Sequence, residues 1–266
     1  MRRLALAALI ALAGCGDSNH PTVSARVVSA AAAKTTQAGT ARVSEQITGS
    51  VNGKSLGDGS LSGAVDGSHH RADVTFDLTF LAKASGGTNP GSLEGRVVYD
   101  GDNAFVTGPA ITSRLPAGRR WVRVTVDQAS DPGGLAGLGT LDATRPVDHL
   151  RAVVGKTEVL GTETVNGAAT KHYRSSVDYR LYLPLVARGR RAAIQKALTK
   201  LESTLNTTRL PVEVWIASDG TIRRTKGIIE GQGVKLEYTL DLSAIGKPLR
   251  IAQPPATRVL DGRKPP

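Results

Sequence analysis

The residues of this chain that could do chemistry are few, and their spacing favours no catalytic or metal-binding arrangement. None of the histidines stands at a metal-type spacing from an acidic residue or a cysteine. The histidines are His20, His69, His70, His149 and His172. We interpret His172, which adjoins Tyr173 in an expected strand, as a packed or surface residue. Asp73 and Asp77 could share a strand face as a carboxylate pair, but such residues are ordinary on a solvated face. With no Gly-x-Ser-x-Gly elbow and no phosphate-binding glycine loop, we expect no catalysis, no metal and no cofactor.

The sulfur chemistry of the chain rests on Cys15, its only cysteine. This residue follows a charged start, Met1–Arg3, and an apolar run at residues 4–12 that is too short to span a bilayer, which takes about 20 residues. The stretch Leu12-Ala13-Gly14-Cys15 resembles the bacterial lipobox, in which the thiol is acylated with diacylglycerol and becomes the new N-terminus. The alternative, a free or buried thiol behind an ordinary signal peptide, would leave an unpaired exported cysteine. We therefore predict a lipoprotein signal peptide at residues 1–14 and lipidation of Cys15.

The chain is strongly basic, and this charge restricts its partners. The formal net charge is +11, and loss of the two charges of Arg2 and Arg3 with the signal peptide would leave +9. A basic, lipid-anchored protein is attracted to anionic headgroups, by about 1 kcal/mol per Lys or Arg near the surface. The basic residues are dispersed and accompany no base-stacking motif, so we expect no nucleic-acid partner. We predict a protein held at the extracytoplasmic face of the cell membrane.

Hydrophobic periodicity predicts one domain at residues 24–253, between a short polar tether at 15–23 and a flexible, proline-rich tail at 254–266. The expected helices are 24–37, 146–154 and 186–205. The expected strands are 41–52, 59–65, 72–80, 93–99, 104–106, 121–126, 157–165, 170–183, 211–217, 221–230 and 233–242, with a short edge strand at 249–251. Turn dipeptides such as Asn52-Gly53 and Asn166-Gly167 separate the strands.

Alternation in the expected strand 72–80 predicts the fold class. Its apolar residues are Ala72, Val74, Phe76, Leu78 and Phe80, all on one face. Strict alternation indicates a sheet with one solvated face and one dry face. Antiparallel strands interrupted by amphipathic helices then predict an α+β fold, in which two or three helices cover the inner face of a single large, strongly curved antiparallel sheet. The 40% hydrophobic content is enough to build its core, and we see no internal repeat.

Four internal stretches, taken together, resemble one known family. They are the alanine-rich opening helix leading into Thr40-Ala41-Arg42-Val43, the run Val97–Val106 with Leu115-Pro116 and Arg120-Trp121-Val122, the run Thr170–Tyr173 ending in Val177-Asp178, and Pro211–Gly220 running on to Ile222-Arg223-Arg224. In this order they are similar to the LppX/LprA/LprF/LprG lipoproteins of mycobacteria and their relatives, which share the fold of the lipoprotein carriers LolA and LolB. Each stretch is partly ordinary strand-and-turn sequence, and together they span most of the mature chain.

The resemblance implies a LolA-like half-barrel wrapped around a hydrophobic cavity, with helices closing its opening. Family members bind acyl chains of lipids or lipoglycans there and help to move them outward from the cell membrane. We therefore expect a lipid or glycolipid ligand, with a membrane transporter or an envelope protein as a further partner. Some relatives act in sensing or regulation, so the alternative is a regulatory or scaffolding lipoprotein with a filled core that docks a partner protein. The chain departs from the family in a glycine-rich opening, which predicts loosely packed first hairpins; these glycines are Gly49, Gly53, Gly57, Gly59 and Gly63.

Two sets of residues are candidates for these contacts. An apolar sheet face suits an acyl chain, because burial is worth about 0.8 kcal/mol per methylene group. The lipid-cavity candidates are Val74, Phe76, Leu78, Phe80, Val212, Val214, Ile216, Val234, Leu236, Tyr238 and Leu240. Their alternative role is to face helices in a filled core. The membrane-surface candidates on the long helix are Arg188, Arg190, Arg191, Lys196 and Lys200, which alternatively form a solvated face.

Overall fold

The structure is a computed structural model, which describes residues 20–84, 92–126, 144–186, 188 and 191–262. Its strands are β1 (Thr22–Ser24), β2 (Thr40–Val51), β3 (Lys54–Asp66), β4 (Arg71–Asp77), β5 (Glu94–Asp100), β6 (Asn103–Thr107), β7 (Trp121–Thr125), β8 (Val153–Val165), β9 (Ala168–Asp178), β10 (Arg209–Ala217), β11 (Ile222–Gly231), β12 (Val234–Ser243) and β13 (Val259–Asp261). Its α-helices are α1 (Arg26–Gln37), α2 (Thr79–Ala84), α3 (Pro109–Thr112), α5 (Tyr179–Tyr182) and α6 (Arg191–Leu205). Short 3-10 helices are η1 (Asp148–Ala152), η2 (Leu183–Leu185) and η4 (Ala256–Arg258).

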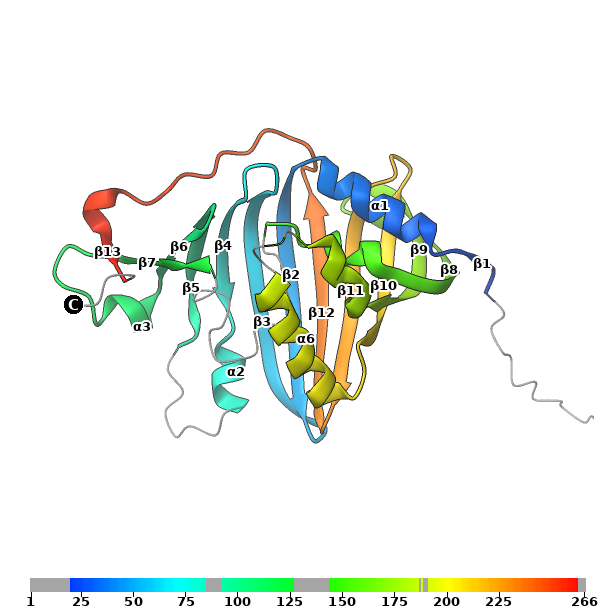
Figure 1. The fold of residues 1–266 in the computed structure, drawn as a ribbon, viewed down its shortest axis with the longest axis horizontal. Coiled ribbons are helices and arrows are strands. Elements are labelled where there is room, and N and C mark those ends of the chain that lie inside the picture. Colours follow the sequence, from blue (N-terminus) through cyan, green and yellow to red (C-terminus); the bar gives the residue numbers. More distant parts are fainter. Residues whose placement is uncertain (1–19, 85–91, 127–143, 187, 189–190, 263–266) are drawn as a thin grey trace, which may run out of the picture.

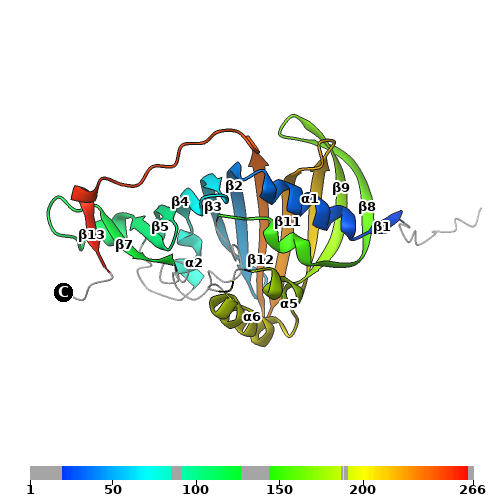
Figure 2. The same ribbon diagram turned by 45° about the horizontal axis from the view of Figure 1, so that its top comes forward.

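All of these strands belong to one sheet. The sheet has 13 strands in the order β1-β8-β9-β10-β11-β12-β2-β3-β4-β5-β6-β7-β13. Neighbouring strands are antiparallel except at one edge, where β13 joins β7 in parallel. Figures 1 and 2 show that the sheet curves and that α1, α5 and α6 lie on its concave side. The predicted single large curved sheet with helices on its inner face is confirmed. In the described part of the chain, no helix is long and apolar enough to cross a membrane.

Two predicted hairpin turns have the backbone conformation that an asparagine–glycine pair favours. Asn52 and Gly53, between β2 and β3, have φ values of 49° and 77°. Asn166 and Gly167, between β8 and β9, have φ values of 49° and 76°. Positive φ at both central residues is the signature of a type I′ turn, whose twist matches that of the flanking strands. These turns set the register in which the strands of each hairpin pair.

The predicted first helix is present as α1 and begins at Arg26. Its buried residues are Val28, Ala31, Ala32 and Thr35. Because most of these side chains are small, the helix lies close against the sheet. The Thr35 hydroxyl donates to the Ala31 carbonyl at 2.7 Å and accepts from the backbone N–H of Ile222 at 2.9 Å. Through this contact α1 is fixed to the first residue of β11.

The strand predicted at 72–80 is wrong beyond Asp77. There β4 ends, and the Asp77 carboxylate accepts a hydrogen bond from the backbone N–H of Thr79 at 3.0 Å, where α2 begins. An aspartate that satisfies a free N–H at a helix start favours the helix, and this local bond overrides the alternating pattern. Leu78 and Phe80 therefore leave the sheet. Phe80, which is 3% exposed, packs back onto it from α2.

Glycines of β2 and β3 form the surface on which Phe80 lies. A Cβ atom at Gly49 would lie 2.6 Å from the Phe80 ring, and one at Gly59 would lie 2.5 Å from it. Because glycine has no side chain, the Phe80 ring can lie directly on the backbone of these two strands. The glycine-rich hairpins, expected to pack loosely, are here covered by an aromatic ring.

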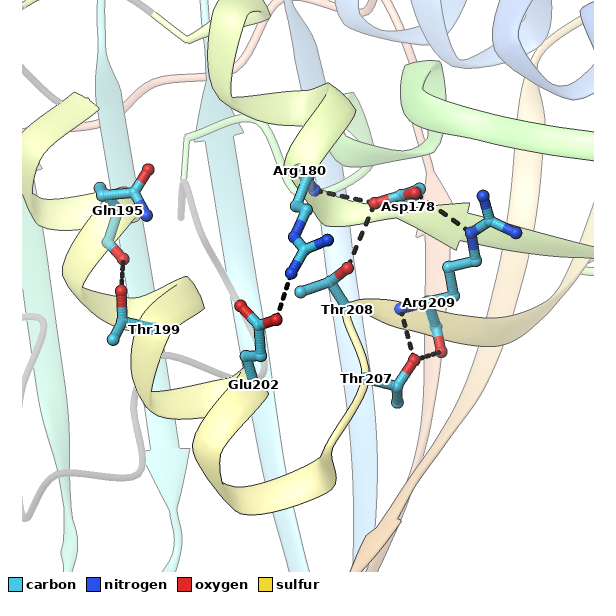
Figure 3. Close-up of polar contacts among 8 residues, drawn as sticks. All are labelled: Asp178, Arg180, Gln195, Thr199, Glu202, Thr207, Thr208 and Arg209. Carbon is cyan, nitrogen blue, oxygen red and sulfur yellow. Dashed lines mark hydrogen bonds and ion pairs between the residues drawn. The ribbon is translucent and has the colours of Figure 1, made fainter.

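The strand predicted at 170–183 also ends early, at Asp178. Its carboxylate accepts from the backbone N–H of Arg180 at 3.1 Å, which caps α5, and from the Thr208 hydroxyl at 3.4 Å (Figure 3). The Arg180 guanidinium in turn pairs with Glu202 of α6 (Figure 3). This capping turns the chain out of the sheet after β9, so that α5 and α6 cover the concave side.

Three shorter predictions also differ from the structure. The helix predicted at 146–154 is the 3-10 helix η1, and the chain is already extended in β8 from Val153. Thr22–Ser24, at the end of the predicted tether, form β1 and pair with β8. Residues 249–251 are not a strand. Of these segments, β1 depends on a partner strand, β8, that is distant in the sequence.

The segment predicted as a flexible tail is structured as far as Gly262. After β12 the chain crosses above neighbouring strands to the far edge of the sheet (Figure 1), where β13 pairs with β7. The Arg119 guanidinium holds this segment by donating to the carbonyls of Thr257 at 3.0 Å and Val259 at 2.8 Å. An edge strand offers unpaired backbone groups, and β13 satisfies them on β7.

Gly49→Ala should destabilise the domain by about 1–3 kcal/mol, because the added methyl group overlaps the Phe80 ring. In a Phe80→Ala background the same substitution should cost much less, since the ring is gone. Urea unfolding of the wild type, the two single variants and the double variant measures both costs. Equal losses in the two backgrounds would show that Gly49 does not seat this ring.

Candidate functional site on the concave side of the sheet

The inner face of the sheet, the face that carries α1, α5 and α6, follows from the strand register. Residues directly opposite one another in an antiparallel pair have their side chains on the same face. One such row across the sheet is Val159, Tyr173, Val214, Thr225, Leu240, Glu45, Leu61 and Phe76. Most of the row is apolar, and the neighbouring rows continue the pattern.

Most of the predicted lipid-cavity residues lie on this inner face. Those buried in one apolar cluster are Val74, Val212, Val214, Ile216 and Leu240. Those that are half-buried and pack against the cluster are Phe76, Leu236 and Tyr238. Leu78 and Val234 are half-buried outside the cluster, and Phe80 is buried on the glycines of β2 and β3. The sheet brings the candidates of β4, β10 and β12 together.

Helices cover the inner face over the central strands. Val28 of α1, Leu150 of η1 and Ile194 of α6 belong to the same buried cluster as Val214 and Leu240. These sheet residues therefore face helices, which is the arrangement that the filled-core alternative expects for this part of the sheet.

Toward β7, the apolar side chains of the inner face are only partly covered. The residues Leu61, Phe76, Tyr99, Val106 and Val124 of β3–β7 are half-buried and pack against the core cluster. We call these residues the apolar strip. Because they extend the buried core without being fully covered, they offer the kind of apolar area that a ligand can bury.

One carboxylic acid interrupts the inner face. Glu45 of β2 is 2% exposed and lies in register between Leu240 of β12 and Leu61 of β3. Among the described residues, no hydrogen bond or ion pair engages its carboxyl group. Burial raises the pKa of Glu45 to about 7, because a charge is disfavoured away from water. Our sequence reasoning missed this residue, although it shares the strand parity of Val43 and Ile47 and is the one charged residue among them.

Aromatic side chains extend this polar region from the sheet to η1. The Tyr238 hydroxyl hydrogen-bonds the Tyr179 hydroxyl, and burial raises the pKa of Tyr179 to about 12. The Tyr179 ring stacks on His149, with 5.7 Å between the ring centroids. One nitrogen of His149 bonds the Pro146 carbonyl, whereas the other, Nε2, is buried and has no partner among the described residues. Burial lowers the pKa of His149 to about 4, so the ring is neutral near pH 7.

On the opposite face of the sheet, His172 is packed, which is one of the two roles expected for it. Its ring stacks on Trp215 with 3.9 Å between the centroids. Its two nitrogens lie 2.9 Å from a carboxylate oxygen of Glu163 and 3.0 Å from one of Glu213. The imidazole thus bridges three strands through carboxylates and an indole ring.

The described basic membrane-surface candidates lie just before α6 and along it. Exposed members are Arg188, Arg191 and Lys196. Arg191 also donates to the Val186 carbonyl at 2.9 Å, so it braces the chain that enters α6. Lys200 belongs to α6, whereas Arg190 and Cys15 lie outside the described residues. Their membrane contacts and the lipidation of Cys15 stay predictions.

Glu45→Gln should make the domain more stable than the wild type at pH 8, by on the order of 3 kcal/mol. The pKa of Glu45 is raised from 4.5 to about 7 in the folded state, so the wild type loses stability as the pH rises from 4.5 to 7. The variant lacks this loss, and its advantage should shrink as the pH falls toward 4.5. Urea unfolding at pH 4.5, 6 and 8 measures the difference.

The pKa of His149 is lowered from 6.5 to about 4, which has the opposite effect, because the folded state resists protonation and the stability rises with pH between 4 and 6.5. In the wild type the two groups oppose each other, whereas in Glu45→Gln only the rise due to His149 remains. The exposed neighbour Gln46 provides the control, since Gln46→Ala should leave the pH profile unchanged. Parallel profiles for Glu45→Gln and the wild type would exclude a titrating Glu45 in the interior.

Comparison with known proteins identifies the fold. No protein-family model matches the chain, and no curated protein sequence matches it significantly. LprF from Mycobacterium bovis is similar in structure, with a TM-score of 0.51 and 15% identity over 86% of this chain and 96% of that one. The Mycobacterium tuberculosis lipoprotein LppX has a TM-score of 0.44 and 18% identity over 85% of this chain and 98% of that one. A LolA superfamily protein from Nitrosomonas europaea has a TM-score of 0.31 and 10% identity over 83% of this chain and 92% of that one. The predicted resemblance is confirmed at the level of the fold by LprF, and the chain has a fold similar to that mycobacterial lipoprotein.

Proposed function

We propose that this protein is a membrane-anchored lipoprotein that binds acyl chains of a lipid or glycolipid on the inner face of its sheet and carries them toward the outer envelope. The observation that supports this function best is the apolar strip, which extends the buried core across β3–β7 and is only partly covered. The fold supports it as well, since the lipoprotein family that the sequence resembles implies acyl-chain binding on this side of the sheet.

The energetics of burial favour an acyl chain as the ligand. Each methylene group moved out of water contributes about 0.8 kcal/mol, so ten of them supply roughly 8 kcal/mol before the cost of ordering the chain. The strip has branched aliphatic side chains and two aromatic rings, and it makes no demand on the orientation of a chain. A lipid tail that lies along these side chains would cover the apolar area that the helices leave partly exposed.

An N-terminal anchor would keep this surface near its source of lipid. The segment from Cys15 to Thr22, where β1 begins, can span at most roughly 25 Å. An acylated Cys15 would therefore hold the domain beside the membrane, from which a lipid could enter. Delivery would then need a receiving partner, such as a membrane transporter or an envelope protein.

Phe76→Asp should weaken binding of a fluorescent fatty-acid analogue at least about tenfold, because it places a carboxylate on the surface that would bury the chain. The matched control is Thr75→Asp, which adds the same group to the exposed face of the same strand. The mature chain carrying Cys15→Ser serves as the parent, so that no covalent lipid competes. Fluorescence titration measures affinity, and circular dichroism checks that each variant is folded.

Lipid that co-purifies with the parent protein, detected by native mass spectrometry, would support the same function. A parent protein that carries no lipid and does not bind the analogue would contradict it. Equal losses in Phe76→Asp and Thr75→Asp would place any binding elsewhere. A lipid-free result would favour the alternative of a scaffolding lipoprotein.

Cys15→Ser in the full precursor should abolish acylation and move most of the protein from the membrane fraction to the soluble fraction. A single thiol carries the predicted anchor, and serine cannot form the thioether. Metabolic labelling with a clickable fatty acid and cell fractionation read out the two effects. If the serine variant stays membrane-bound, another part of the chain holds it there.

A further inference from the structure

A line of polar side chains crosses the apolar inner face and belongs to no predicted contact. Its members are Glu45, Tyr238, Tyr179 and His149, and we call them the inner polar cluster. Glu45 and His149 are 2% and 8% exposed, and Tyr179 is 7% exposed. The cluster therefore lies inside the domain and not at its rim.

The members of the cluster are neighbours in space although they come from different elements. Glu45 lies opposite Leu240, and Tyr238 stands two residues earlier on the same face of β12, which makes it the diagonal neighbour of Glu45. Burial is the largest cause that raises the pKa of Tyr238 well above its usual value, and the charges of Tyr179 and Glu45 contribute to the same rise. Tyr238 bonds Tyr179, which stacks on His149.

The backbone makes room for this arrangement at Gly227. The residue lies directly opposite Tyr238 in the β11–β12 pair. A Cβ atom at Gly227 would come within 2.5 Å of the Tyr238 ring and of its hydroxyl oxygen. The ring is thus laid across β11 only because that strand has no side chain there, and this directs its hydroxyl toward Tyr179.

The two ends of the cluster have unused capacity to accept hydrogen bonds. Among the described residues, no group bonds the Glu45 carboxyl or Nε2 of His149. The other nitrogen of His149 bonds the Pro146 carbonyl and so holds the proton, which leaves Nε2 with a free lone pair. An unpaired buried polar group is costly, and a carboxyl group more so than an imidazole. Thr225, opposite Leu240 on the same face, also has a buried hydroxyl without a partner among the described residues. Such groups on one mostly apolar face point to a polar ligand that supplies donors.

We propose that the inner polar cluster binds hydroxyl groups of an uncharged amphiphile, such as a glycerol or sugar head, whose acyl chain lies along the apolar inner face. The proposal rests on the proposed lipid-binding function and adds the chemistry of the head. Hydroxyl groups fit because they donate to Glu45 and to His149 and also accept from the tyrosine hydroxyls. An ammonium group could donate as well, but it cannot accept from the tyrosine hydroxyls.

An anionic head fits this cluster poorly. Burial raises the pKa of Glu45, and among the described residues no ion pair engages its carboxyl group. The charged groups of η1 are engaged with each other, since Arg151 pairs with Asp148 at 3.3 Å. Arg180 of α5 pairs with Glu202 of α6. A phosphate group next to Glu45 would therefore meet repulsion without a compensating partner.

The experiment compares ligands that share one acyl chain. Monolauroylglycerol, methyl laurate and lauryl phosphate are titrated at pH 8 against the mature chain carrying Cys15→Ser, by displacement of the fluorescent fatty-acid analogue. This parent should prefer monolauroylglycerol over methyl laurate roughly tenfold, as expected for hydrogen bonds to a charged acceptor. Lauryl phosphate should bind no better than methyl laurate.

Glu45→Leu should reduce this preference to about twofold or less, because the buried carboxylate that accepts from the hydroxyl groups is gone. Methyl laurate should bind at least as well as before. Gln46→Leu, on the exposed face of the same strand, should keep the full preference. Tyr238→Phe, which keeps the ring and removes its hydroxyl, should lower the preference in part and serves as a second variant.

The possible outcomes separate this inference from the function on which it rests. An unchanged preference in Glu45→Leu, or tight binding of lauryl phosphate, would overturn the proposal that the cluster reads hydroxyl groups. Equal binding of monolauroylglycerol and methyl laurate by the parent would overturn it too, and acyl-chain binding would stand. If none of the ligands binds the parent, the proposed function fails and this inference fails with it.

Discussion

Burial of one face of a continuous sheet is the constraint on which the rest of this structure depends. The register aligns apolar residues of β8–β12 and β2–β4 into rows on the same side, such as Val214, Leu240 and Leu61. A face of this extent must be covered, because exposed apolar area costs roughly 25 cal/mol per Å². The helices α1, α5 and α6 cover its central part, and the apolar strip of β3–β7 is left half-covered.

Short-range hydrogen bonds supply the segments that cover the face. Asp77 and Asp178 each stand at the end of a strand and accept from a backbone N–H two residues later. These bonds favour a helical turn where the alternating pattern would extend the strand, so that α2 and α5 fold onto the concave side. The glycines of β2 and β3 then receive Phe80, and Gly227 receives Tyr238. Because these glycines have no side chains, they determine where the aromatic rings lie.

The polar residues of the interior have an energetic cost that packing alone does not explain. Burial raises the pKa of Glu45 to about 7 and lowers that of His149 to about 4, and both effects oppose stability where the group would otherwise be charged. Apolar residues of similar size would avoid this cost. Residues that lower stability without compensation from neighbours are often kept for binding, which is the reason to regard this cluster as a site.

Local patterns in the sequence predict most of the strands, the hairpin turns and the face on which most apolar residues lie. Alternation and Asn-Gly pairs are local signals, so Val74, Val214 and Leu240 were assigned to the inner face correctly. The ends of β4 and β9 come from local caps that compete with the alternating pattern. The pairing of β13 with β7 depends on the tertiary structure, because edge pairing leaves no local pattern. The sequence shows that Glu45 shares a strand face with apolar residues, but it does not show that its carboxyl group lacks a partner. Whether a partner reaches a buried carboxyl group depends on side chains that the fold brings from distant parts of the chain.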